Sequence, residues 1–203
     1  MSKILRTLTG AAFAGAAFAA LSAAATPAAA ANEYTIDKTH ADVVFWVNHL
    51  GYSNTWGRFN AMDGTLVLDP ENPAASSVAI VIQAATIDTN LKKRDDHLRS
   101  PDFFNTAEYP TITFTSTSVT PTGEMTADVT GDFTLLGVTK EITIPVTINK
   151  LAQHPMQNSK EVVGLSGQVT IDRTEFGMTY GAGPIGTEIP IFIELEFERP
   201  ISE

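Results

Sequence analysis

The chain has 203 residues, no Cys, and 23 acidic against 13 basic residues, which gives a net charge of −10. A protein this acidic is repelled by nucleic acid and by anionic membrane surfaces unless it carries a local basic patch. The lack of Cys excludes disulfides and zinc sites built on thiolates. We therefore expect no nucleic-acid partner, and a fold that its core alone must stabilise.

The first 31 residues have the layout of a secretory signal peptide. Lys3 and Arg6 precede an apolar, Ala-rich stretch from Leu8 to Leu21, and the small residues of Ala28–Ala31 offer a cleavage site. A membrane-spanning helix is the alternative, which the short apolar stretch and the following Pro27 disfavour. We expect export, and the lack of Cys favours the periplasm over an extracellular location.

One domain, residues 32–203, remains after cleavage and is long enough to bury a substantial core. It keeps 11 basic and 23 acidic residues, so its net charge is −12. Apolar and polar residues alternate along most of it, which is typical of antiparallel strands with one face turned to an apolar interior. We expect strands at about residues 34–37, 42–49, 56–69, 76–87, 110–119, 124–136, 139–151, 160–173 and 188–198.

The alternation stops between Thr89 and Tyr109, where helical signals appear. Asn90 is a candidate N-cap for a short helix, and Ser100-Pro101-Asp102 is typical of the start of a second helical turn. A β chain of this length with one helical insert, at about residues 90–105, predicts a meander barrel with the helix over one end. A two-sheet sandwich is the alternative.

A glycine-rich segment, Gly177–Gly186, precedes the last predicted strand. Glycine permits unusual backbone angles and close approach of other groups. Two interpretations stay open: a mobile portal beside the barrel mouth, or an ordinary surface connection.

Sequence motifs of catalysis and metal binding are missing. The four His residues, at positions 40, 49, 97 and 154, lack the spacing of a helical metal site. There is no G-x-S-x-G elbow, P-loop or dinucleotide fingerprint, and the adjacent Asp95 and Asp96 point in different directions. We therefore expect no enzyme, no catalytic residue, no metal and no cofactor.

Four of the 11 basic residues of the mature domain lie within eight positions, at 92, 93, 94 and 99. Together with His97 they form a local positive patch that could receive an anionic head group. The alternative is a solvated helix face whose charge Asp95 and Asp96 partly neutralise. Arg94 and His97 are the better candidates for head-group contact, because the apolar Leu91 and Leu98 flank them.

An eight-stranded barrel has an interior that is either filled by side chains or just wide enough for one small ligand. Several residues expected to point inward are small, which favours room for a guest. They are Ala79, Ala84, Ala127, Gly131 and Gly167.

Seven motifs occur in order along the mature chain. They are Asp37-x-x-His40, Phe45-x-Val47-x-His49, Gly57-x-Phe59, Arg94-Asp95-x-His97-Leu98-x-Ser100-x-Asp102-Phe103-Phe104, Tyr109-Pro110-x-Ile112-x-Phe114, Gly131-x-Phe133-Thr134-Leu135-x-Gly137-Val138-Thr139-Lys140 and Asp172-Arg173-x-x-Phe176-Gly177. Together they resemble the YceI-like family of exported, polyisoprenoid-binding, lipocalin-like proteins. The resemblance implies an eight-stranded antiparallel barrel, a periplasmic location and a long apolar ligand such as an isoprenoid quinone or polyprenyl chain.

We expect an all-β, eight-stranded antiparallel lipocalin-like barrel with a short helical insert, acting as a carrier that sequesters a long-chain amphiphilic isoprenoid or fatty lipid. An enzyme acting on a small lipid-like substrate, with His49 or His97 as acid/base, is the alternative, and a binding module with a filled core is a third. The lipid is the expected partner, and transient contact with a membrane or membrane protein and a homodimer stay open. The residues expected to line the cavity are Phe45, Val47, Ile80, Ile82, Phe114, Val129, Phe133, Ile144, Val146 and Ile193, and those expected at the head group are His49, Arg94 and His97.

Overall fold

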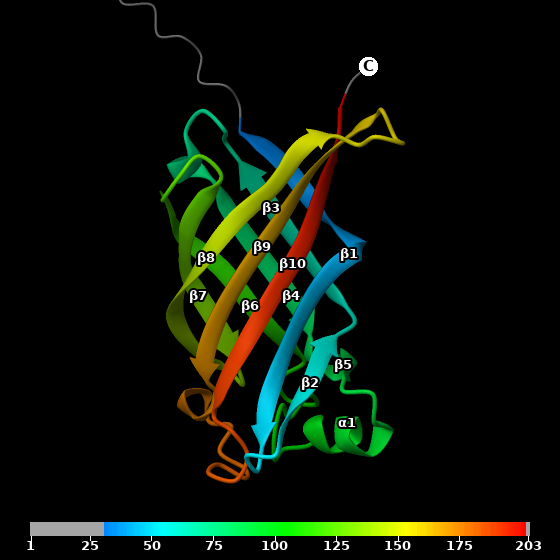
Figure 1. Ribbon diagram of the computed structural model, residues 1–203, viewed down its shortest axis with the longest axis vertical. Helices are drawn as coiled ribbons and strands as arrows, with labels where there is room; N and C mark the ends of the chain where they lie inside the picture. Colours follow the sequence, from blue (N-terminus) through cyan, green and yellow to red (C-terminus); the bar gives the residue numbers. More distant parts are fainter. Residues whose placement is uncertain (1–30, 202–203) are drawn as a thin grey trace, which may run out of the picture.

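The computed structural model describes residues 31–201, which build a closed barrel with short segments over one end (Figure 1). The predicted signal peptide, residues 1–31, lies outside the described residues except for Ala31. The strands are β1 (Asn32–His49), β2 (Ser53–Phe59), β3 (Met62–Leu68), β4 (Ser77–Gln83), β5 (Ile87–Asp88), β6 (Thr111–Pro121), β7 (Thr126–Leu135), β8 (Val138–Gln153), β9 (Lys160–Asp172) and β10 (Glu188–Pro200). The helices are α1 (Lys92–Leu98) and three single 3₁₀ turns, η1 (Pro73–Ala75), η2 (Ala84–Thr86) and η3 (Arg173–Phe176).

Eight strands close the barrel in the order β1-β3-β4-β6-β7-β8-β9-β10, and the antiparallel pairing of β10 with β1 completes the ring. The two other strands, β2 and β5, extend from the lower half of β1 beside the barrel (Figure 1). The eight-stranded antiparallel barrel is therefore confirmed, and the sandwich alternative is wrong.

The predicted strands differ from the structure in three places. The one at 76–87 is divided into β4, the turn η2 and the first residue of β5. The segments at 34–37 and 42–49 form one continuous strand, β1, whose register shifts between Ile36 and Ala41. The segment at 56–69 is two strands, because β1 pairs with β3 through its first residues and with β2 through its last. A strand that changes partner along its length leaves no signal in the local alternation of residues.

The helical insert is shorter than the sequence predicts. Leu91 precedes α1, so the predicted N-cap at Asn90 is wrong. Asn90 instead has a φ of 61°, a left-handed conformation that Asn tolerates better than most residues. The predicted second helix at Ser100 is a turn, in which the Phe103 N–H donates to the Ser100 carbonyl at 3.0 Å.

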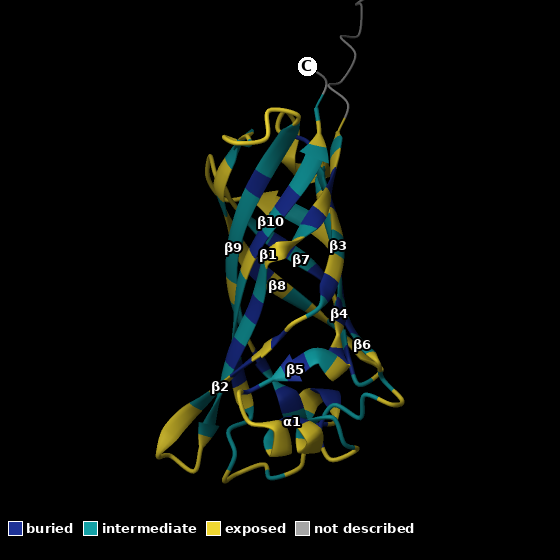
Figure 2. Cartoon of the chain, turned by 90° about the vertical axis from the view of Figure 1, so that its right-hand side faces the viewer, coloured by how far each residue is buried: buried dark blue, intermediate teal, exposed yellow. Residues whose placement is uncertain are grey.

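Both ends of the barrel contain fully buried side chains. Tyr34, Val163 and Phe197 lie toward the end near the termini, while Ile87 and Phe176 lie toward the end that α1 covers. Figure 2 shows dark-blue, buried segments along the strands and beside α1 and β5. No helix within residues 31–201 is both long and apolar enough to cross a bilayer.

Candidate ligand-binding site

An apolar cavity of about 930 Å³ lies inside the barrel. Each of the eight barrel strands turns aliphatic or aromatic side chains into it, because alternate residues of a strand point to the same face. The ten residues expected from the sequence to line a cavity all do so. They are Phe45, Val47, Ile80, Ile82, Phe114, Val129, Phe133, Ile144, Val146 and Ile193. That they contact a ligand stays a prediction.

One position near the middle of the cavity wall is a glycine. Gly167 on β9 pairs with Val146 on β8 and with Ile193 on β10, and all three line the cavity. A Cβ on Gly167 would come within 3.2 Å of the Ile144 Cγ2. At this level the wall therefore has one position that projects no side chain into the lumen.

Small residues explain the cavity only in part. Ala127 and Gly167 line it, as expected, but Ala79, Ala84 and Gly131 do not. Ala79 alternates with the inward-facing residues of β4 and so lies on the outer face, and Ala84 is the one buried residue of the turn η2. The space beside Gly131 is taken by the ring of Phe114, which a Cβ there would approach to 2.8 Å.

The three residues predicted to contact a head group lie at the end of the cavity that α1 covers. His49 ends β1 there, and Arg94 and His97 belong to α1. The Arg94 Nε and Nη2 donate to the Oγ1 and the carbonyl of Thr89, both at 2.6 Å. The His97 Nε2 lies 2.9 Å from the Asp102 Oδ2. The structure thus brings these residues to one polar rim, and their role in binding stays a prediction.

The other basic residues of the patch have structural partners or face solvent. Lys92 and Arg99 both pair with Asp96, and Arg99 also donates to two carbonyls of the segment before α1. Asp95 does not neutralise this face, because it is buried and accepts hydrogen bonds from the N–H and hydroxyl of Thr89. The solvated-face interpretation therefore holds for the patch outside Arg94 and His97.

Arg173 also lines the cavity, and the residue pattern around it predicts no role for its side chain. Its side chain is 3% exposed and donates to four backbone carbonyls. Burial lowers the pKa of Arg173, and the negative charge of Asp172 opposes that shift. The four acceptors belong to Met178, Tyr180, Ile185 and Gly186. One guanidinium thus holds the glycine-rich segment in place through four hydrogen bonds. No local pattern of residues predicts these contacts.

An aromatic contact joins the two segments that cover this end. The ring of His97 lies 5.0 Å from that of Phe103 and 5.3 Å from that of Tyr180, and the last two are 5.1 Å apart. Tyr180 belongs to the glycine-rich segment and lines the cavity. The segment is therefore part of the cavity rim, as the portal interpretation expects, and its mobility stays a prediction.

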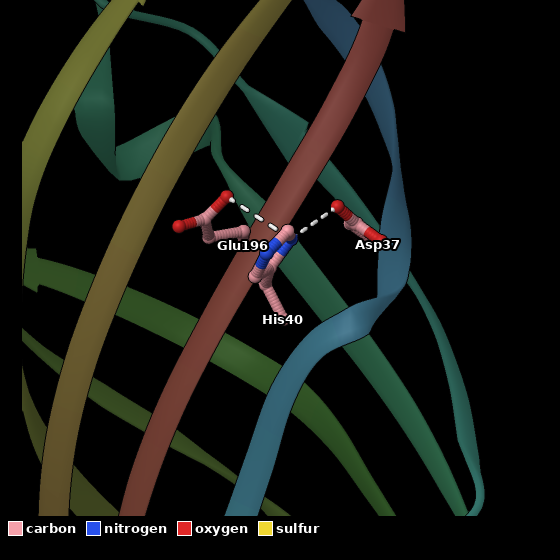
Figure 3. Close-up of side chains that lie close together, drawn as sticks. All are labelled: Asp37, His40 and Glu196. Carbon is pink, nitrogen blue, oxygen red and sulfur yellow. Dashed lines mark hydrogen bonds and ion pairs between the residues drawn. The ribbon is translucent and has the colours of Figure 1, made fainter.

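A second cluster of titratable side chains lies on the outer face of the barrel, at the irregularity of β1 (Figure 3). The His40 Nδ1 is 2.8 Å from the Asp37 Oδ2 and 3.9 Å from the Glu196 Oε2. Partial burial raises the pKa of Asp37, but hydrogen bonds from His40 and Thr39 outweigh it and lower this pKa to about 2. The hydrogen bond to Asp37 raises the pKa of His40. His40 is exposed, Asp37 and Glu196 are half-buried, and none of the three lines the cavity. The geometry of the cluster is that of an ion pair at the strand irregularity.

Comparisons with known proteins agree with this architecture. The sequence model of the YceI-like domain matches residues 34–197. The chain belongs to the YceI-like family. Protein YceI of Escherichia coli O157:H7 is 42% identical over 168 residues, which are 82% of this chain and 86% of that relative. A UPF0312 protein of Ectopseudomonas mendocina (strain ymp) is 40% identical over 168 residues, 82% of this chain and 87% of the relative.

Solved structures share the fold. BcnA of Burkholderia cenocepacia is 25% identical, with a TM-score of 0.70 over 79% of this chain and 98% of that one. A polyisoprenoid binding domain from Saccharophagus degradans, implicated in plant cell wall breakdown, has a TM-score of 0.66 at 20% identity, over 82% of this chain and 98% of that one. The family inferred from the motifs is therefore confirmed.

Proposed function

We propose that this YceI-like protein is a periplasmic carrier that sequesters a long-chain amphiphilic isoprenoid or fatty lipid in its barrel. The observation that carries the proposal is the apolar cavity of about 930 Å³ within a closed wall. That volume is near the upper end of the usual range for small-molecule sites, and its lining offers few polar groups to orient a compact polar substrate. The periplasmic location rests on the predicted signal peptide.

A chain-like ligand suits this cavity energetically. Burying apolar chain contributes roughly 0.8 kcal/mol per CH₂, so a few isoprene units offset the several kcal/mol lost on association. The polyisoprenoid-binding description of the Saccharophagus degradans domain supports the same ligand class, which we carry to this chain as part of the proposal.

The charges on the cavity lining favour one orientation of the ligand. Arg94 and His97 lie on α1 at one rim of the cavity, whereas the acidic Asp69 and Glu124 line the cavity near the opposite end. An anionic or strongly polar head group is stabilised at the first rim and repelled at the other. We therefore place the head group beside His49, Arg94 and His97, with the chain extending toward Phe114 and Val129.

One observation keeps an enzymatic function as the second candidate. The pair of His97 and Asp102, at 2.9 Å, is an arrangement that can orient a general base at the cavity rim. Among the described residues 31–201, no Ser, Thr or Lys side chain hydrogen-bonds to His97, so a nucleophile beside it is missing there. A carrier needs no such group.

Lipid extraction from the purified mature protein, followed by mass spectrometry, tests the proposal. We expect near-stoichiometric, chemically unmodified lipid. The double variant Val146→Phe/Ile193→Phe fills the space over Gly167 and should lose most of it, whereas Thr147→Phe places the same ring on the outer face and should not. Protein that carries no lipid and takes up none from detergent-dispersed polyprenol would contradict the carrier.

The variant His97→Ala separates the two candidates. A carrier retains its chain and binds it more weakly, because only a head-group contact is lost. An enzyme converts added lipid to a product, and that turnover disappears with the histidine.

A further inference from the structure

Exposed apolar side chains gather at the end of the barrel that carries α1. Within residues 31–201, eight large hydrophobic side chains are exposed. Two of them, Met125 and Met156, lie near the other end. Contiguous exposed apolar surface marks interaction sites more often than it occurs by chance. The six at the α1 end are Leu50, Tyr52, Trp56, Leu91, Val138 and Tyr180.

Two neighbouring segments at this end carry no Asp, Glu, Lys or Arg at all. One is the β1–β2 hairpin from Val43 to Gly57, and the other is the glycine-rich segment from Phe176 to Thr187. They lie side by side, since the Leu50 N–H donates to the Pro184 carbonyl at 2.9 Å and the Gly186 N–H donates to the Asn48 carbonyl at 2.9 Å. We call these two segments the uncharged tip. Residues 72–87 and 109–123 also lack charged side chains, but they form the paired wall strands β4 and β6 and the turns that flank them, whereas the uncharged tip lies at one end of the barrel.

The residue at the hairpin turn is unfavourable for folding. Leu50 and Gly51 have φ values of 57° and 76° in the turn that the Tyr52 N–H closes on the His49 carbonyl, and a Leu in this left-handed conformation is strained where Asn or Gly is tolerated. Leu136 and Gly137 form the same kind of turn between β7 and β8, but the Leu136 side chain packs against the core. The Leu50 side chain is 50% exposed and has no such compensation. The fold therefore does not explain a Leu at this position.

Aromatic side chains continue the apolar surface up the outer face of the sheet. Trp46 lies directly opposite Trp56 on the hairpin, and the ring of Trp56 is 5.8 Å from that of Phe192 on β10. Tyr52, at the turn, is 88% exposed. Trp and Tyr have apolar bodies and polar edges, so they are stabilised at the boundary between lipid head groups and acyl chains.

The uncharged tip is continuous with the mouth of the cavity. Ser53, Thr55 and Tyr180 belong to the tip and also line the cavity. A lipid chain that moves between a bilayer and the barrel at this place crosses a short path without charges. Its head group can stay at the rim beside Arg94, at the depth of the bilayer's own head groups.

We propose that the protein docks on an electrically neutral lipid bilayer through the uncharged tip, with Leu50, Tyr52 and Trp56 entering the interface. This inference rests on the proposed carrier function and names the surface through which its ligand passes. A bilayer is favoured over a protein partner because the surface is projecting, lacks charges that would give specific pairing, and rims the cavity.

The two Trp residues of the chain, Trp46 and Trp56, both lie in the hairpin and outside the cavity lining, so their fluorescence reports on the tip alone. We expect their emission to shift to the blue when the mature protein is titrated with phosphatidylcholine vesicles. The shift should persist at high salt and should not increase when phosphatidylglycerol replaces part of the lipid, because docking does not depend on charge.

The variant Leu50→Asn/Tyr52→Asn is the decisive change. Asn is favoured at the turn position of Leu50, so the fold is retained, while burial of the two apolar side chains is lost. We expect partitioning into vesicles to weaken by at least about tenfold. Met156→Asn removes an exposed apolar side chain at the opposite end and serves as the matched control, which should partition like the unchanged protein.

Three results would overturn the docking surface. One is the absence of a blue shift with vesicles, and another is an equal loss for Met156→Asn. The third is a blue shift that follows protein concentration without lipid, together with a dimer in analytical ultracentrifugation that Leu50→Asn/Tyr52→Asn dissociates. A protein that takes up dispersed polyprenol but ignores vesicles contradicts the docking alone, whereas one that docks but holds no lipid contradicts the carrier function alone.

Discussion

Along the strand pair β9 and β10, the interior of the barrel is filled at one height and hollow at another. Near the termini, Phe197 pairs with Val163 and both side chains are completely buried. Four residues along, Ile193 pairs with Gly167, and both face the cavity. The alternation of residues is the same at both levels, so alternation alone does not decide whether a barrel is filled. The filled level contributes stability and the empty level contributes space, which means that the two can be changed separately.

Phe197→Ala should have the largest effect on stability. Removing a fully buried ring costs about 3–5 kcal/mol of unfolding free energy, because the lost contacts leave a void. Ile193→Ala is the matched change at the empty level and should cost no more than about 2 kcal/mol, since part of that side chain already lacks neighbours. Urea unfolding measures both, and equal losses would mean that the two levels do not differ.

Arg173→Met should come next, because it removes the donor to four carbonyls of the glycine-rich segment. A buried carbonyl left without a donor costs about 1–3 kcal/mol. Because one of these hydrogen bonds is buried and the other three are partly buried, we expect a total loss of about 2–4 kcal/mol of unfolding free energy. Hydrogen exchange should accelerate in residues 177–186 and stay unchanged around Phe197. Exchange that accelerates equally in both places would refute a local role for Arg173.

Val146→Phe/Ile193→Phe should affect stability little and lipid content strongly. The rings enter empty space rather than a packed core, so the unfolding free energy should change by less than about 1.5 kcal/mol. A loss above that value would indicate that the lumen at Gly167 is already filled. The effect on binding is measured as the amount of lipid extracted per protein, compared with the amount extracted from Thr147→Phe.

Asp37→Asn should have the smallest effect on stability, because Asp37 lies on the outer face of the barrel. The Asp37 pKa of about 2 lies below its usual value of 3.8, so this carboxylate stabilises the fold above about pH 4 and loses that contribution as the pH falls toward 2. The raised pKa of His40 means that the His40 contribution is complete below pH 6.5 and is lost at higher pH. In Asp37→Asn, NMR titration should show a lower pKa for His40. The unfolding free energy should also depend less on pH between about pH 4 and pH 2. An unchanged His40 pKa would contradict the pairing.

The residues facing the cavity could be predicted from the sequence because side-chain direction along a strand is a local property. Phe114, Val129 and Ile144 occupy inward positions for that reason. Ala79 shows the limit, because its parity depends on where β4 begins and its small size suggested an inward role that the structure contradicts. The Arg94–Thr89 contact and the position of His97 at the rim depend on how the helical insert packs on the barrel. The residue types near α1 predicted a helix over one end of the barrel but not these contacts.

The amino-acid sequence by itself determined the antiparallel strands, their apolar faces and the family, since these depend on residue order over short distances. The tertiary structure decided which levels of the barrel are filled. Gly167 lines the cavity because strand pairing places it between Val146 and Ile193, whereas Gly131 does not line it and lies against the ring of Phe114. The same holds for Arg173, whose four acceptors are brought together by the path of the chain. Volume and hydrogen bonding between distant segments are properties of the assembled barrel, and no local pattern of residues encodes them.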